Sequence, residues 1–107
     1  MNDFDYQQID DLIHSRIRLA VMAALTTMGP ASFSLIKSTV KATDGNLSVH
    51  MRKLEDGGYL QVDKSFIDRK PVSIYKLTQK GIKAFNIYIH YLENMLPLKE
   101  IEELEKK

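Results

Sequence analysis

Apolar residues change from helical to strand-like spacing at the glycine pair Gly57-Gly58. Before the pair they recur every three or four positions, the spacing that places them on one face of an α-helix. After the pair, the runs 59–67 and 72–77 are rich in β-branched and aromatic residues and alternate roughly every two positions, as β-strands do. We therefore expect helices in the first half, followed by a β-hairpin.

Two helices are predicted before residue 43. The first spans 9–28 and ends at Gly29-Pro30, because this pair stops helices. Its apolar positions are Ile9, Ile13, Ile17, Ala20, Val21, Ala24, Leu25 and Met28. The second begins at a cap on Ser32 or Ser34 and ends near Ala42. Its expected inward residues are Leu35, Ile36, Thr39 and Val40.

The third predicted helix, 44–56, has two different faces. Thr43 or Asp44 serves as its N-cap, and its inward face holds Leu47, His50, Met51 and Leu54. A packing role is favoured for His50, because this spacing places it at the edge of the buried face. The outer and flanking residues are Asn46, Ser48, Val49, Arg52 and Lys53.

The outer residues of this helix suit a DNA major groove. Arginine and asparagine pair with purine edges, a methyl group touches thymine, and serine or lysine more often contacts phosphate. Gly45 would let the backbone at the helix start approach a phosphate closely. An ordinary solvent-exposed helix contains the same residue types, so this segment alone leaves both interpretations open.

The hairpin, 60–77, has a basic tip, because Asp68-Arg69-Lys70-Pro71 forms the predicted turn. Lys64, Arg69 and Lys70 are candidate contacts to the DNA backbone or minor groove. Taken alone, they fit an ordinary solvated turn better.

Two short helices joined by a tight turn and followed by a hairpin have the order of a winged helix-turn-helix. The predicted fold is α+β, mostly α, in one domain over 1–107 with its core at 9–96.

A fourth helix is predicted from a cap at Thr78 to Pro97, with a charged tail at 98–107 that is either helical or frayed. Its spacing gives a seam of Ile82, Phe85, Ile89, Leu92 and Leu96, and further apolar residues at Ile87, Tyr88, Tyr91 and Met95. Because a helix with several apolar faces must bury more than one of them, we expect this helix to form a homodimer interface. A broad contact within one monomer is the alternative.

Space between the paired helices could hold an apolar effector lined by Tyr88, Tyr91 and Met95, although simple interface packing explains the same residues better. No particular effector is indicated. A two-fold dimer would present two copies of the third helix to successive major grooves, so the DNA site should be a pseudo-palindrome.

Charge is unevenly distributed, although the formal net charge is only +1. Residues 1–11 contain four acids and no base, residues 12–92 contain twelve Lys and Arg against five acids, and residues 93–107 contain five acids against three Lys. The basic centre suits nucleic acid.

With no cysteine, and with His14, His50 and His90 on different predicted helices, we expect no metal site and no cofactor.

No phosphate-binding loop, nucleophile motif or metalloprotease motif occurs in the sequence, so an enzyme is not predicted. Glu55-Asp56 fit helix-end charges better than an acid–base pair. The acidic start does not resemble a secretory signal, and no apolar run is long enough to span a membrane. A cytoplasmic location is expected.

Several motifs together resemble the winged-helix transcriptional regulators of the MarR/ArsR-like group, especially their small single-domain members. The resemblance covers about 9–96 and rests on Thr43-Asp44-Gly45-Asn46-Leu47-Ser48, His50-Met51, Lys53-Leu54-Glu55, Gly58-Tyr59-Leu60, Phe66, Arg69-Lys70-Pro71, Tyr75, Leu77-Thr78 and Gly81. Met51 and Gly57 depart from the commoner leucine and alanine.

The resemblance implies a homodimeric, sequence-specific binder of double-stranded DNA that regulates transcription, with a repressor as the expected type. It implies helix contacts from Gly45, Asn46, Ser48, Val49 and Arg52, and wing contacts from Arg69 and Lys70. The alternative is a winged-helix module that binds protein or RNA, since a fold does not fix a function.

Overall fold

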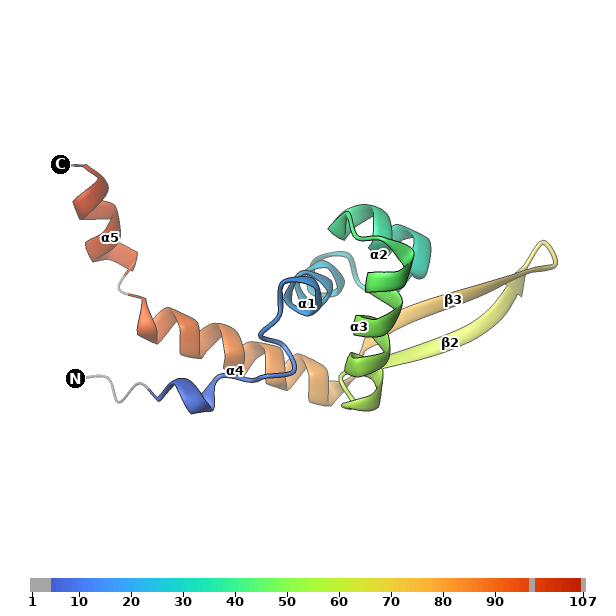
Figure 1. Ribbon diagram of the computed structural model, residues 1–107, viewed down its shortest axis with the longest axis horizontal. Coiled ribbons are helices and arrows are strands. Elements are labelled where there is room, and N and C mark those ends of the chain that lie inside the picture. The colour runs from blue at the N-terminus through green and yellow to red at the C-terminus, as the bar shows by residue number, and fades with distance from the viewer. Residues whose placement is uncertain (1–4, 97, 107) are drawn as a thin grey trace.

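The computed structural model describes residues 5–96 and 98–106, and Figure 1 shows the course of the chain. In chain order the elements are the 3-10 helix η1 (Tyr6–Gln8), α1 (Arg16–Met28), β1 (Ala31–Ser32), α2 (Phe33–Val40), α3 (Asp44–Asp56), β2 (Leu60–Ile67), β3 (Lys70–Leu77), α4 (Gln79–Met95) and α5 (Leu98–Glu105). This order confirms the predicted winged helix-turn-helix. We call the β2–β3 hairpin the wing.

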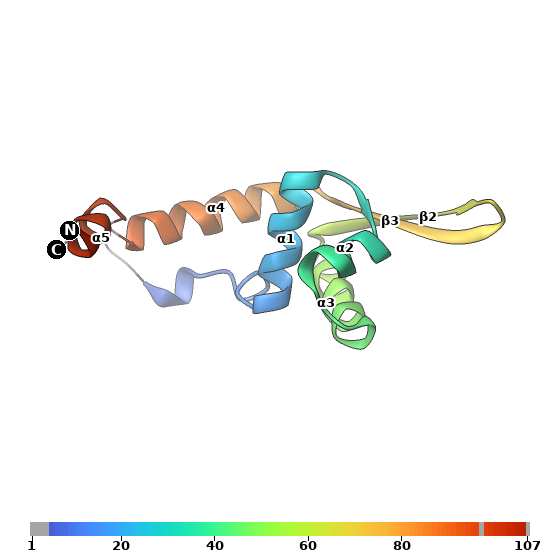
Figure 2. The same cartoon turned by 90° about the horizontal axis from the view of Figure 1, so that it is seen from above.

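The molecule is elongated, with principal extents of 57 × 29 × 22 Å. Figures 1 and 2 show α1, α2 and α3 grouped together, with the wing and α4 projecting from this group in opposite directions. The wing therefore forms one end of the molecule and α5 lies at the other, with α3 between them beside the base of the wing.

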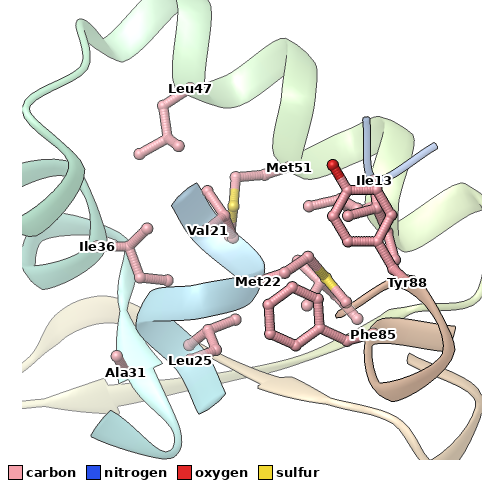
Figure 3. Close-up of a cluster of buried hydrophobic side chains, with 12 residues drawn as sticks. Ile13, Val21, Met22, Leu25, Ala31, Ile36, Leu47, Met51, Phe85 and Tyr88 are labelled. Atoms are coloured by element: carbon pink, nitrogen blue, oxygen red, sulfur yellow. The ribbon is translucent and has the colours of Figure 1, made fainter. Parts of the chain in front are cut away.

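The core lies where α1, α2, α3 and α4 meet, and Figure 3 shows their apolar side chains pointing toward one another. Its members are Ile13, Val21, Met22, Leu25, Ala31, Ile36, Leu47, Met51, Leu54, Leu60, Phe85 and Tyr88. Leu47 and Leu54 are fully buried and Met51 is nearly so, as their spacing on α3 predicts. Removing one buried leucine side chain from such a core typically costs 2–5 kcal/mol, so these three residues fix the orientation of α3.

The sheet has three antiparallel strands in the order β1-β3-β2. The pairing of β2 with β3 runs without interruption from Leu60 opposite Leu77 to Ile67 opposite Lys70. The predicted four-residue turn is wrong, because Lys70 and Pro71 belong to β3 and only two residues form the turn. These are Asp68 and Arg69, with φ of 50° and 66°. Positive φ at both central residues matches the twist of a two-residue hairpin.

Strand β1 was not predicted. Its two residues, Ala31 and Ser32, pair with Tyr75 and Ile74 of β3. A two-residue strand has too little sequence for a periodic signal, and its pairing is decided by where β3 passes. The strand attaches the start of α2 to the base of the wing.

The first predicted helix begins too early. Residues between Gln8 and Arg16 are not helical, and α1 starts after Ser15, whose hydroxyl accepts a hydrogen bond from the Arg18 backbone N–H at 3.5 Å. Before it, the Asp10 carboxylate accepts from the backbone N–H groups of Leu12 and Ile13 and turns the chain. Ile13 still reaches the core from this irregular segment. Its apolar side chain therefore fits the helical spacing, which explains why the predicted helix began too early.

Helix α2 is capped by Ser32, whose hydroxyl accepts from the Leu35 backbone N–H at 3.1 Å. Ile36 is buried and Val40 is half-buried, as expected. Leu35 and Thr39 are exposed, so their predicted inward placement is wrong. An eight-residue helix has little more than two turns, and its contact with the core is made by Phe33, Ile36 and Val40.

Helix α4 is capped by Thr78 as predicted, and ends at Met95 with Leu96 as its C-cap. The expected stop at Pro97 lies outside the described residues. Phe85 and Tyr88 are buried in the chain's own core, which corrects their expected place at a dimer interface. They pack with rings 6.4 Å apart in a stacked arrangement. Within the predicted seam, Ile82, Ile89 and Leu96 are exposed.

The segment 5–15, which we call the N-terminal arm, lies along one side of α4 (Figure 2). The Tyr91 hydroxyl accepts from the Asp5 backbone N–H at 2.7 Å and donates to the Asp5 carbonyl at 2.8 Å. The Tyr88 hydroxyl lies 2.8 Å from Nδ1 of His14. These contacts hold the arm against its own α4.

Candidate nucleic-acid interface

Helix α3 presents its predicted outer residues to solvent. Thr43 caps it, its hydroxyl accepting from the Asn46 backbone N–H at 3.3 Å, and Gly58 turns the chain into the wing with φ of 82°. All six candidates on the helix are exposed: Gly45, Asn46, Ser48, Val49, Arg52 and Lys53. The buried face therefore anchors the helix, and the opposite face is available to a partner.

The basic side chains of this surface form no ion pair within the described part of the chain. In residues 5–96 and 98–106 the only ion pair is Lys37–Asp44, at 2.9 Å between half-exposed and exposed side chains. Within the same residues, Arg52, Lys53, Lys64, Arg69 and Lys70 have no carboxylate at ion-pair distance. Such a set of unpaired cations attracts phosphate without first breaking an internal contact.

A groove of about 240 Å³ separates α3 from the wing. Ser48, Arg52 and Glu55 line it from α3, and Val62 and Lys64 line it from β2. The groove therefore brings Arg52 and Lys64 together from two elements. Sequence reasoning overlooked its other members, Phe33, Met51 and Tyr75, although the alternation of the strands places Val62 and Tyr75 on the same face.

Glu55 is the acidic member of this groove. Burial raises the pKa of Tyr75, and the negative charge of Glu55 raises it further. Tyr75 therefore stays a neutral phenol whose hydroxyl suits a hydrogen bond rather than a charge. Glu55 lies toward the C-terminal end of α3, so its charge is separated from the N-terminal residues Gly45 and Asn46.

The three wing candidates are all exposed but do not share one face. Lys64 lines the groove beside α3. Lys70 is paired with Ile67, an odd-numbered position of β2, and so lies on the opposite face of the hairpin. Arg69 is in the turn itself. The wing therefore presents positive charge on both faces and at its tip. This arrangement suits contacts to the phosphates of both DNA strands better than contacts to one strand.

His50 takes part in the contact between α1 and α3. It is half-buried, and its Nδ1 accepts a hydrogen bond from the Arg18 guanidinium at 2.8 Å. Burial lowers the pKa of His50, and the positive charges of Arg18 and Lys53 lower it further. The interaction agrees with the packing role predicted for His50.

The base of the wing is tied to the N-terminal arm. The Tyr59 hydroxyl donates a hydrogen bond to the Asp10 carboxylate. Burial and this bond raise the pKa of Tyr59 to about 12. Beside this bond a hollow of about 490 Å³ lies between the arm and α4, lined by Tyr88, Tyr91 and Ile87 among others. The space predicted between paired helices at Tyr88 and Tyr91 is therefore bordered by the chain's own arm.

No group of three or more metal-binding side chains occurs among the residues that the structure describes. Across those same residues, no helix is long and apolar enough to cross a membrane.

A capped helix with an exposed polar face, a turn and a basic wing beside it define a winged helix-turn-helix fold. Residues 17–96 match the family model described as winged helix DNA-binding domain, and the chain belongs to that family. An uncharacterized protein from Methanocaldococcus jannaschii is 35% identical over 79 residues, which cover 74% of this chain and 86% of that protein.

Solved structures show the same fold. The structure of a transcriptional regulator homologue from Pyrococcus horikoshii matches with a TM-score of 0.73 and 28% identity, over 78% of this chain and 83% of that one. A putative transcriptional regulator of the MarR family from Enterococcus faecalis matches with a TM-score of 0.68 and 20% identity, over 89% and 82%. The family match confirms the predicted resemblance to winged-helix DNA-binding proteins, and these solved structures share the fold.

Proposed function

We propose that this protein is a homodimeric transcriptional regulator, acting as a repressor, that binds a specific sequence of double-stranded DNA. The single observation that carries the proposal is the groove where Arg52 of α3 and Lys64 of the wing meet, with no carboxylate paired to either among the described residues. Helix α3 would enter the major groove, and the wing would contact the flanking backbone or minor groove. The family of DNA-binding domains to which the chain belongs supports this assignment.

Individual residues would have different roles. Arg52 and Asn46 have the side chains that pair with guanine and adenine edges, and the methyl groups of Val49, 54% exposed, suit thymine. Ser48 donates its hydroxyl to the Asp44 carbonyl at 2.7 Å, which leaves its oxygen as an acceptor. Gly45, Lys53, Lys64, Arg69 and Lys70 would contact phosphates and set the register on the duplex.

The proposed dimer would form through α4. Ile82, Ile89 and Leu96 are spaced by seven residues, so they lie on one strip of the helix. Each is about two-fifths exposed, at 40%, 38% and 41%. A second copy packed antiparallel on this strip would bury all three and place Ile89 near the two-fold axis. Two α3 helices about 34 Å apart would then meet successive major grooves of a pseudo-palindrome.

Selection from a pool of random duplexes tests the proposal, followed by affinity measurements at several salt concentrations. We expect an inverted-repeat site, bound by two chains, with affinity that falls steeply as salt rises. Sedimentation of the protein–duplex complex gives the number of chains. The DNA assignment would be rejected if the protein showed no salt-sensitive binding to any duplex and bound a single-stranded RNA or another protein instead.

A further inference from the structure

The outer half of the wing exposes two large apolar side chains that the fold does not use. Phe66 is 75% exposed and Ile67 is 58% exposed. Among the described residues, Phe66 takes part in none of the aromatic contacts, which involve His14, Phe33, Tyr75, Phe85 and Tyr88. A phenylalanine that is 75% exposed adds little to the hydrophobic stabilisation of the chain, so most of its ring is available to a partner.

The pairing register shows which way Phe66 faces. Val62 and Lys64 line the groove beside α3, and alternate residues of a strand point to the same face. Phe66 follows Lys64 by two positions, and its cross-strand partner is Pro71. Phe66 and Pro71 therefore extend the α3-facing side of the wing outward, whereas Ile67 is on the opposite face.

The charges around Phe66 indicate the chemistry of its partner. Lys64 lies on the same face toward the base of the wing. Arg69 lies beyond Phe66 in the turn, next to the acidic Asp68. An apolar ring between two unpaired cations suits a surface in which apolar sugar edges lie between rows of phosphate. The DNA minor groove has this composition, and apolar side chains of DNA-binding proteins enter it at the base steps.

We propose that Phe66, supported by Pro71, packs into the minor groove that flanks the site bound by α3 and gives the wing a preference for A·T pairs. The guanine amino group projects into the minor groove of a G·C pair, whereas an A·T pair leaves that position free. A ring seated against the groove floor would be displaced by that amino group. This inference rests on the proposed DNA-binding function and adds a specificity that the basic residues do not provide.

The experiment compares three duplexes that share the selected central site and differ in the flanking pairs under the wing. The flanks are A·T, G·C, or inosine·C, which lacks the guanine amino group but otherwise presents the functional groups of G·C. The unmodified protein should bind the A·T and inosine·C duplexes roughly tenfold more tightly than the G·C duplex. A loss of affinity of this size is typical of one unfavourable base pair in a binding site. Weaker binding to the G·C duplex, but not to the inosine·C duplex, would show that the wing contacts the minor groove.

Substitutions then assign the effect to the ring. Phe66→Ala should bind all three duplexes alike, with roughly tenfold weaker binding to A·T flanks and an unchanged dependence on salt. Phe66→Leu should keep part of the discrimination, since leucine is also an apolar wedge. The matched control is Ile67→Ala, which removes the neighbouring apolar residue from the other face and should behave like the unmodified protein.

Other results would overturn the inference. If Phe66→Ala and Phe66→Leu discriminated among the flanks as the unmodified protein does, the ring would have no part in the preference. If Phe66→Ala altered the sedimentation of the free protein and not its DNA preference, the ring would be a protein contact. These results leave binding to the central site intact, whereas loss of all duplex binding by the unmodified protein would also remove the proposed function.

Discussion

The guanidinium of Arg18 donates a hydrogen bond to Nδ1 of His50, at 2.8 Å, and so joins α1 to the middle of α3. The Arg18 side chain also bonds the backbone carbonyl of Leu12 in the N-terminal arm. Arg18 thus connects the arm, the first helix and the proposed DNA-contacting helix. The bond requires His50 to be neutral, because a protonated imidazole has no acceptor at Nδ1.

The folded protein should therefore become less stable at acidic pH, because His50 becomes protonated. Its pKa is lowered in the folded protein below the usual 6.5, so the unfolded chain binds more protons between the two pKa values. The stabilisation is present above pH 6.5 and is lost as pH falls toward the folded pKa. His50→Asn keeps an acceptor at a similar position and does not titrate. Thermal unfolding between pH 5 and 8 should show a weaker pH dependence for this variant, and equal slopes would contradict the prediction.

Arg52→Ala should weaken binding to the selected duplex by about 1–3 kcal/mol and relax the preference at one base pair. The reason is that a bidentate arginine–guanine contact would be lost. Arg52→Lys is the matched control, since it keeps the charge but lacks the planar pair of donors. Titrations on the four single-pair variants of the site measure the effect. Equal losses on all four would identify Arg52 as a phosphate contact.

Lys70→Ala should make the log–log salt dependence of DNA affinity shallower by about one unit, because one phosphate contact would be removed. Lys64→Ala should have a similar effect from the other face of the wing. Lys106→Ala is a suitable control, because Lys106 directly follows α5, and Figure 1 shows α5 at the opposite end of the molecule from the wing. The measurement is fluorescence anisotropy across a salt series. An unchanged slope for Lys70→Ala would remove this residue from the proposed contacts.

Two glycines should respond oppositely to alanine. A Cβ on Gly81 would lie 2.3 Å from the Tyr59 carbonyl oxygen, so Gly81→Ala should destabilise the fold by about 1–3 kcal/mol. A Cβ on Gly45 would meet nothing within 4 Å. Gly45→Ala should leave the unfolding temperature unchanged or raise it, yet weaken DNA binding if phosphate approaches the backbone there. Unchanged affinity of folded Gly45→Ala would rule out that close approach.

Ile89→Glu should dissociate the proposed dimer, since it places a charge at the centre of the exposed strip. Sedimentation equilibrium should give a dimer for the unmodified protein and a monomer for this variant. Ile87→Glu is the control, because Ile87 is 56% exposed and borders the hollow on the arm side. A monomer at micromolar concentration for the unmodified protein would contradict the proposed dimer.

The sequence by itself determined the local elements and most of the proposed interface. Apolar spacing and the cap at Thr43 set the limits of α3, so its outer residues follow from the geometry of one helix. The two strands of the wing were predicted because β-branched and aromatic residues are frequent in them. These features depend on neighbours within a few positions, and such neighbours are visible in the sequence.

Only the tertiary structure decided which apolar surfaces are covered. Phe85 and Ile89 belong to the same predicted seam, yet Phe85 packs into the core and Ile89 remains exposed. Ile13 enters the core from a segment that is not helical. The pairing register likewise separates Lys64 from Lys70 and places Phe66 beside the proposed DNA surface. Burial and register depend on residues distant in sequence, so spacing determines which side chains share a face but not what that face meets.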